Sequence, residues 1–165
     1  RDIRLILKGS GTAEDAALAC DHGVEGVYVS NHGGRQLDQG RGTLDVLPEF
    51  VQAERGRASF LIHDSFMRGT DVVKAIALGA QVVGMGRLTC CGLAAAGQAG
   101  LVRVFELLEE EIRLCLGLLG VDRLAALNPS YLHAAPPVRP AHMTSAFPLL
   151  EEALVSNMNH SRRAW

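Results

Sequence analysis

The stretch "VYVSNHGGRQLD", residues 27–38, joins a predicted strand to a polar loop. Val27, Tyr28 and Val29 favour a buried β-strand, and the Ser-Asn pair that follows ends it. A histidine, two glycines and an arginine then fill residues 32–35. Because the ligands of parallel α/β proteins bind at the carboxyl ends of the strands, this loop predicts a binding site.

Three further apolar runs have the same character. Each is short and bounded by glycine, asparagine, aspartate or serine, as in buried parallel strands. They cover residues 5–7, 60–62 and 82–85. The sequence therefore predicts four strands.

Helical patterns lie between and after these strands. The first begins at Thr12, a predicted N-cap with Asp15 as the acid three residues later. The others cover residues 44–53, 72–78 and 101–119, the last preceded by helical sequence from Leu93. Alternating strands and helices predict right-handed βαβ units in a parallel sheet.

Two architectures fit this alternation in residues 1–127. One is an open doubly wound sheet, and the other is half of a (β/α)8 barrel, which normally takes about 250 residues. Half a barrel has two open strand edges and one uncovered inner face. Residues 128–165 form a proline-rich C-terminal tail, in which residues 151–165 have the pattern of a short helix.

The composition favours a compact α/β protein, with 48% hydrophobic residues and 18 glycines in 165. The net charge of −2 gives no reason to expect a nucleic-acid partner or a membrane surface. We find no apolar run long enough to span a bilayer and no signal peptide, so we expect a cytoplasmic protein. The four cysteines have no metal-binding spacing, and we expect reduced thiols and no metal site.

Polar residues follow each predicted strand. They are Lys8-Gly9, Ser30 to Arg35, His63-Asp64-Ser65 with Arg68, and Gly86-Arg87. Taken singly, a lysine here is usually a solvated charge, a histidine a structural residue and a glycine pair a turn. Together they predict an electropositive pocket for an anionic ligand, with one group able to take a proton near neutral pH.

The string "SNHGGRQLD", residues 30–38, closely resembles the signature of the FMN-dependent α-hydroxy-acid dehydrogenases and oxidases. The resemblance extends over nearly all of residues 5–127. It includes "LILKGSGTAEDA" at 5–16, "RGTDVVKAIALGA" at 68–80, "GMGR" at 84–87 and "GLAAAGQAGLVRVFELLEEEI" at 92–112. It implies strands five to eight, the C-terminal half, of a TIM (β/α)8 barrel. It also implies FMN as cofactor and oxidation of a 2-hydroxy acid to a 2-oxo acid.

The resemblance also implies roles for individual residues. His32 would be the base that takes a proton from the substrate. Arg35 would pair with the substrate carboxylate, which suits a bidentate guanidinium. Lys8 would lie at the pyrimidine edge of the flavin and stabilise negative charge there. The other cofactor-binding residues would be Ser30 at the isoalloxazine, Gly86 and Arg87 at the phosphate, and Asp64, Ser65 and Arg68 in the segment before it.

The segment "HDSFMRGTD", residues 63–71, departs from the family pattern. The family usually reads Asp-Gly-Gly-x-Arg-Arg-Gly-Thr-Asp, or Asp-Ser-Gly at its start. Counted back from Arg68, His63 falls where the family's ribityl-binding aspartate lies, and Met67 falls on a phosphate-binding arginine. A slip of one residue would instead restore Asp64 to the aspartate position. Both alignments are open, and both alter the FMN contacts.

Several alternatives also stay open. In the family the remaining substrate and flavin contacts come from the N-terminal half, so the chain fits a fragment, one chain of a split enzyme, or a half-barrel that pairs with itself as a homo-oligomer. The rival function is a non-catalytic half-barrel that binds FMN weakly or not at all. A weaker rival is a different FMN barrel enzyme, such as an isomerase or synthase. Neither the particular 2-hydroxy acid nor the electron acceptor can be read from these residues.

Overall fold

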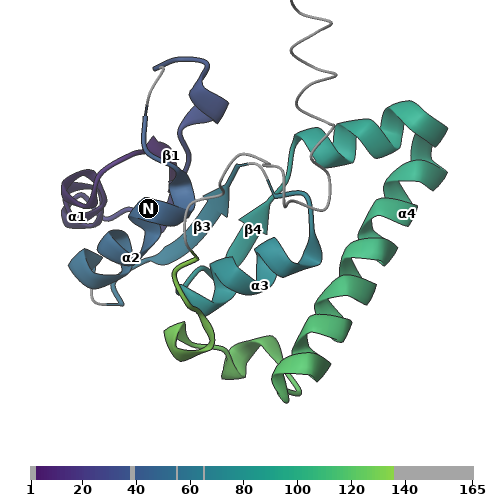
Figure 1. The fold of residues 1–165 in the computed structure, drawn as a ribbon. Coiled ribbons are helices and arrows are strands. Elements are labelled where there is room, and N and C mark those ends of the chain that lie inside the picture. Colours follow the sequence, from purple (N-terminus) through teal and green to yellow (C-terminus); the bar gives the residue numbers. More distant parts are fainter. Residues whose placement is uncertain (1–2, 38–39, 55, 65, 136–165) are drawn as a thin grey trace, which may run out of the picture. The chain divides into compact units, whose positions relative to one another are not determined.

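The computed structural model describes residues 3–37, 40–54, 56–64 and 66–135. Four parallel strands form one sheet (Figure 1). They are β1 (Ile6–Ser10), β2 (Gly26–Val29), β3 (Ser59–His63) and β4 (Val82–Gly84). The helices that follow them are α1 (Ala13–Asp21), α2 (Thr43–Glu54), α3 (Gly69–Ala77) and α4 (Arg87–Leu119). The predicted alternation of strands and helices is confirmed.

The order of the strands separates the two predicted architectures. The sheet runs β1-β2-β3-β4, so each strand lies beside the one before it in the sequence. A doubly wound sheet reverses its order at a switch point, whereas a barrel adds each strand next to the last. The order without reversal favours part of an α/β barrel.

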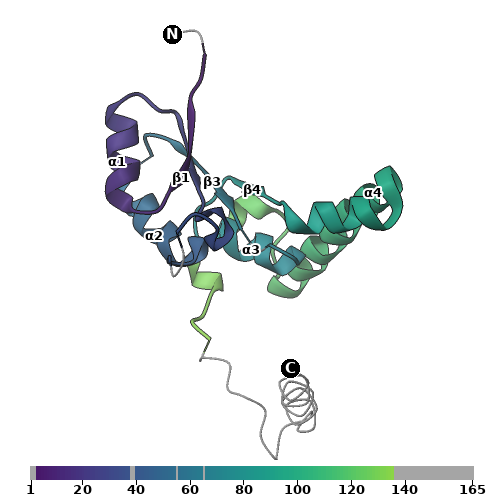
Figure 2. The same cartoon turned by 90° about the horizontal axis from the view of Figure 1, so that it is seen from above.

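One face of the sheet is the buried core. Alternate residues of β2 and β3 point into it, namely Val27, Val29, Phe60 and Ile62, and none of them is more than 3% exposed. Residues of α1, α2 and α3 complete this core: Ala16, Ala19, Val46, Leu47, Phe50 and Ala75. All three helices therefore cover the same face of the sheet (Figure 2), as the outer ring of a barrel does.

The opposite face of the sheet is open. The strand register places Lys8, Tyr28, Leu61 and Val82 in one row across the four strands, on this face. Val82 is 49% exposed, and Ile6, two residues before Lys8 on the same face, is 58% exposed. An apolar sheet face without cover matches the uncovered inner face expected of a partial barrel.

Helix α4 is interrupted once. Ala96 and Gly97 leave helical geometry, and the helix turns there before continuing to Leu119 (Figure 1). Within the described residues, α4 is long and apolar enough to cross a membrane by length and composition alone. The expectation that no apolar run reaches that length is therefore wrong. A single helix that passes this test is weak support for a membrane span.

Two element boundaries differ from the predicted ones in a way that affects the site. β1 continues to Ser10, so Lys8 lies within the strand instead of after it. α4 begins at Arg87 instead of near Leu93, which makes Arg87 the first residue of a helix. The predicted cap is confirmed, because the Thr12 hydroxyl accepts a hydrogen bond from the amide of Asp15 at 3.2 Å.

The chain divides into two units after Leu132. Two short 3₁₀ turns, Leu124–Ala126 and Pro129–Tyr131, end the described part of the first unit. The predicted boundary at 127–128 stays a prediction. The helix expected over residues 151–165 lies outside the described residues.

Candidate functional site

A cavity of about 580 Å³ opens at the carboxyl ends of the strands. Its size is in the range of small-molecule and cofactor sites. The residues that line it come from all four strand ends: Lys8, His32, Gly33, Arg35, Gln36, His63, Asp64, Phe66, Met67, Gly86, Arg87 and Cys90. Six of the predicted site residues, Lys8, His32, Arg35, Asp64, Gly86 and Arg87, therefore lie around one space.

The ammonium group of Lys8 is fixed by residues of the neighbouring strand. Its Nζ donates a hydrogen bond to the hydroxyl of Ser30 at 3.1 Å and lies 5.6 Å from the ring centroid of Tyr28. Ser30 is almost completely buried, so its hydroxyl is a rigid acceptor. A cation over an aromatic face is attracted by the ring. Lys8 is thus held at the edge of the cavity with its charge available to a ligand.

His32 lies in a tight 3₁₀ turn, His32–Gly34, directly after β2. The Asn31 side chain caps this turn by accepting the amide of Gly33 at 2.8 Å, and the Ser30 hydroxyl accepts the amide of His32 at 3.2 Å. His32 has φ 56°, a left-handed conformation that residues other than glycine rarely adopt. Such local strain is typical of functional sites.

Gly9 makes room for the His32 imidazole. A Cβ on residue 9 would lie 2.8 Å from Cε1 of His32, closer than real contacts allow, and Gly9 has φ +102°. The β1 backbone is therefore in direct contact with the imidazole ring. Position 9 requires glycine both for its conformation and for the place of His32.

Two side chains at the end of β3 have unused hydrogen-bonding capacity. The His63 imidazole meets the Tyr28 ring edge-on, with centroids 5.9 Å apart and planes at 87°. His63 Nδ1 and Asp64 Oδ2 are buried without a hydrogen-bond partner. The Nδ1 to Oδ1 distance between the two residues is 3.8 Å, too long for a hydrogen bond. Burial of a polar atom without a hydrogen-bond partner costs about 1–3 kcal/mol. A ligand that forms hydrogen bonds with both atoms would remove this cost, which is a physical reason to expect a ligand here.

Burial also affects Tyr28 itself. Desolvation raises the pKa of its hydroxyl above the ordinary value of 10.0. Tyr28 is therefore a neutral side chain at physiological pH, and its ring contacts both the ammonium group of Lys8 and the imidazole of His63.

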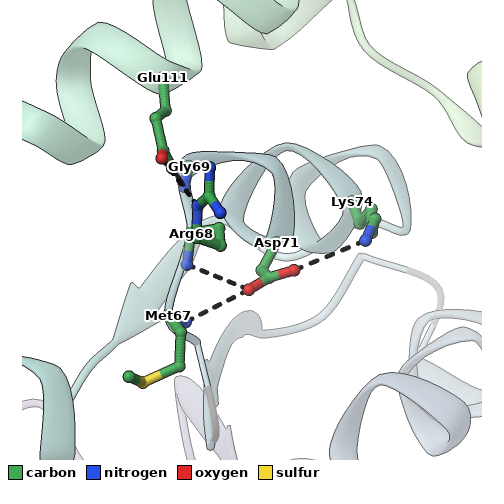
Figure 3. A network of polar contacts seen from close by, with 6 residues as sticks. All are labelled: Met67, Arg68, Gly69, Asp71, Lys74 and Glu111. Atoms are coloured by element: carbon green, nitrogen blue, oxygen red, sulfur yellow. Dashed lines mark hydrogen bonds and ion pairs between the residues drawn. The ribbon is translucent and has the colours of Figure 1, made fainter. Parts of the chain in front are cut away.

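The Arg68 side chain binds a residue of α4. Its Nε donates to Oε1 of Glu111 in α4 at 2.7 Å, while the other carboxylate oxygen accepts the amide of Gly69 at 2.6 Å (Figure 3). Asp71 accepts the backbone amides of Met67 and Arg68 and pairs with Lys74 (Figure 3). Arg68 thus joins α3 to α4 and is not among the described residues that line the cavity. Its predicted contact with a cofactor stays a prediction.

The start of α4 is the part of the cavity best suited to an anion. Gly86 is the N-cap residue, and Arg87 is the first residue of the helix. A Cβ on Gly33 would lie 2.9 Å from Nη2 of Arg87, so the guanidinium lies against the turn that carries His32. A helix N-terminus beside a guanidinium is a favourable place for a phosphate group.

The described residues fit FMN by their chemistry. Buried polar atoms without partners on His63 and Asp64 provide contacts for a polyol. Gly86 and Arg87 at the start of α4 suit the phosphate, and Lys8 provides a cation for an electron-rich ring. Ser65, a further predicted contact, lies outside the described residues.

A parallel α/β barrel segment with a cationic cavity at its carboxyl edge defines a class of proteins that bind phosphorylated cofactors. Comparison with protein families identifies the family within that class to which the chain belongs. The model of the FMN-dependent dehydrogenase family matches residues 1–134, and the chain belongs to this family.

Curated relatives have similar sequences over the same region. The chain is 46% identical over 131 residues to an L-lactate oxidase of Nostoc, covering 79% of this chain and 36% of the relative. It is 42% identical over 134 residues to the 2-hydroxyacid oxidase 1 of Mus musculus, covering 81% of this chain and 36% of the relative. The chain therefore spans about a third of the length of the curated relatives it matches.

Solved structures with similar folds also have similar sequences. A soluble mutant of the membrane-associated (S)-mandelate dehydrogenase from Pseudomonas putida superposes with a TM-score of 0.77 at 41% identity, over 82% of this chain and 38% of that one. A mandelate oxidase with benzoyl-formic acid superposes with a TM-score of 0.74 at 44% identity, over 76% and 38%. Another relative, from Arabidopsis thaliana, is named as peroxisomal. Location differs among the relatives, and a cytoplasmic location for this chain stays a prediction.

One residue of the cavity region, Tyr28, is predicted from the sequence only as part of a strand. Strand alternation could have found Tyr28, because the β1–β2 register pairs it with Lys8 on the open face. His63 is among the polar residues predicted at the strand ends, but its contacts with Tyr28 and Gly84 come from other strands and could not be predicted from its place after β3.

Proposed function

We propose that this chain is the C-terminal half, strands five to eight, of an FMN-dependent (β/α)8 barrel that oxidises a 2-hydroxy acid to a 2-oxo acid. The observation that carries the proposal is the shared cavity of Lys8, His32 and Arg35. A base, a carboxylate clamp and a fixed cation are the groups that this reaction needs. The similarity to L-lactate oxidase and 2-hydroxyacid oxidase supports the same chemistry.

Each residue has a defined task in this proposal. Arg35 binds the carboxylate of the substrate through its planar guanidinium and fixes the orientation of the substrate. His32 takes a proton from the substrate as the α-carbon is oxidised, and the turn that holds it keeps the imidazole toward the cavity. FMN, when bound, accepts the two electrons that the substrate loses. Lys8 stabilises negative charge on the cofactor side of the cavity, and Ser30 holds its ammonium group in place.

The partners proposed for the chain follow from its open sheet face and its length. The small-molecule partner is a 2-hydroxycarboxylate, and L-lactate and mandelate are candidates because relatives act on them by name. The uncovered face with Ile6 and Val82 requires cover from an N-terminal half-barrel or a second copy of the chain.

A competing proposal is a non-catalytic half-barrel. Two observations favour it. The guanidinium of Arg68 is hydrogen-bonded to Glu111, and the sheet face is open, so fewer side chains remain to bind the cofactor. It is opposed by the common cavity of Lys8, His32, Arg35 and Arg87. The two proposals make different predictions for one experiment.

The experiment is the visible absorbance spectrum of the purified chain after addition of FMN and desalting. The catalytic proposal, with the open sheet face covered by a second copy of the chain, predicts a retained flavin spectrum that bleaches when L-lactate or (S)-mandelate is added without oxygen. His32→Ala should keep the flavin and slow bleaching at least ~10²-fold, the usual contribution of a positioned base. A flavin that is retained but never bleached supports the non-catalytic proposal, and bleaching at the wild-type rate in His32→Ala refutes the role of His32.

A further inference from the structure

The imidazole of His63 lies where β4 passes into α4. A Cβ on Gly84 would lie 3.4 Å from Cδ2 of the ring, and a Cβ on Gly86 would lie 3.3 Å from Nε2. The ring therefore lies along two glycines, and Nε2 is next to the N-cap residue of α4. A side chain at Gly86 would press against Nε2, whereas one at Gly84 would be in ordinary contact with the ring.

The contacts of the ring leave its polar atoms for a ligand. The Tyr28 ring fixes its orientation through an edge-on contact. Nδ1 is buried without a hydrogen-bond partner, and the nearest acid, Asp64, is 3.8 Å away. A buried nitrogen without a partner in a cavity wall indicates a missing ligand contact.

An anion at the start of α4 would meet His63 and Arg87 together. Gly86, Arg87 and His63 line the same cavity. The N-terminus of a helix favours negative charge, and charge-assisted hydrogen bonds to phosphate oxygens are the strong ones. Residues 67 and 68 supply no cation for this anion. Met67 is apolar, and the guanidinium of Arg68 is hydrogen-bonded to Glu111.

We propose that His63 is a second hydrogen-bond donor to the phosphate group of the bound cofactor, through Nε2 and beside Arg87. The proposal rests on the proposed binding of FMN and adds a residue to that site. The charged or titratable groups around the ring are Asp64 beside Nδ1, Tyr28 at the ring edge, and Lys8, Arg87 and Cys90 in the same cavity wall.

Binding of FMN and of riboflavin, which lacks the phosphate, tests this role without any measurement of activity. Flavin fluorescence quenching by the full chain gives both affinities for the wild type, His63→Gln and His63→Asn. Glutamine keeps a neutral donor near the place of Nε2, whereas asparagine keeps one near Nδ1 only. The matched control is His22→Gln, because His22 is exposed at the end of α1 and lines a different cavity.

We expect FMN affinity to fall about tenfold in His63→Asn and by a smaller factor in His63→Gln, because only glutamine keeps a donor near the place of Nε2. Riboflavin affinity should be unchanged in both variants, which also shows that they fold.

The outcomes are distinguishable. An equal loss for FMN and riboflavin, or an FMN affinity of His63→Asn equal to that of the wild type, overturns the role of His63 while leaving the proposed function in place. A wild-type chain that binds neither flavin overturns the binding of FMN by this chain and the role of His63 with it. An effect of His22→Gln as large as that of His63→Gln also overturns the role.

Discussion

Gly69, the first residue of α3, contacts α4 so closely that any side chain there must separate the two helices. A Cβ on residue 69 would lie 2.6 Å from Cβ of Glu111, 2.7 Å from the backbone nitrogen of Ile112 and 2.8 Å from the carbonyl oxygen of Leu108. Two of these three atoms belong to the backbone of α4, so no rotation of a flexible side chain can relieve the contact. The amide of Gly69 also donates to Glu111 at 2.6 Å and would move with the helix.

The size of the effect follows from these distances. Ordinary contacts begin at 3.4 Å, so Gly69→Ala requires shifts of 3.4 − 2.6 = 0.8 Å from Glu111 and 3.4 − 2.8 = 0.6 Å from Leu108. Overpacking of this kind costs about 1–3 kcal/mol, while alanine in a helix gains at most about 1 kcal/mol over glycine. We expect a net loss of stability, which lowers Tm by roughly 2–4 °C for each kcal/mol in a chain of this size.

Thermal unfolding followed by circular dichroism measures this loss. The matched control is Gly117→Ala, on the same α4 helix, where a Cβ would meet nothing within 4 Å. That variant should be stabilised by up to about 1 kcal/mol through helix propensity alone. Equal melting temperatures for Gly69→Ala and the wild type, or equal losses in both variants, would refute the close contact between α3 and α4.

Two further predictions concern the cavity. Gly9→Ala should keep FMN but slow its bleaching by a 2-hydroxy acid at least about tenfold, because the new Cβ displaces the His32 imidazole; unchanged bleaching in stopped flow would contradict this placement. Burial raises the pKa of Tyr28 above 10.0, so the folded state holds that proton more tightly than the unfolded state. Its contribution to stability is therefore complete below the unfolded value and is lost as pH rises through the folded value. Urea midpoints at about pH 8 and about pH 10.5 should fall more in the wild type than in Tyr28→Phe, and parallel falls would show that burial has no such effect.

Much of the fold could be predicted from the sequence because its signals are local. Short β-rich runs bounded by turn residues gave all four strands, and Thr12 gave the first helix cap. The order of the strands could not be read in this way. It depends on which strands pair through the backbone, and the observed order of β1 to β4 is what favours a barrel over a doubly wound sheet.

The candidate site was predicted in part for the same reason. Parallel strands bring their carboxyl ends to one edge, so Lys8, His32, Arg35 and Arg87 could be grouped before their distances were known. Arg68 could not be placed, because its partner Glu111 is 43 residues away along the chain. Whether a guanidinium faces a cavity or a neighbouring helix is decided by long-range packing.

The sequence by itself determined the alternation of strands and helices, the residue types at the strand ends and the family. Those properties depend on neighbouring residues, whose backbone preferences and spacing are written in the chain order. Only the tertiary structure decided that Lys8 is held by Ser30, that Gly9 contacts the His32 ring, and that buried polar atoms of His63 and Asp64 are left for a ligand. These features arise where separate strands meet, and the distances between such strands are set by packing of the whole sheet.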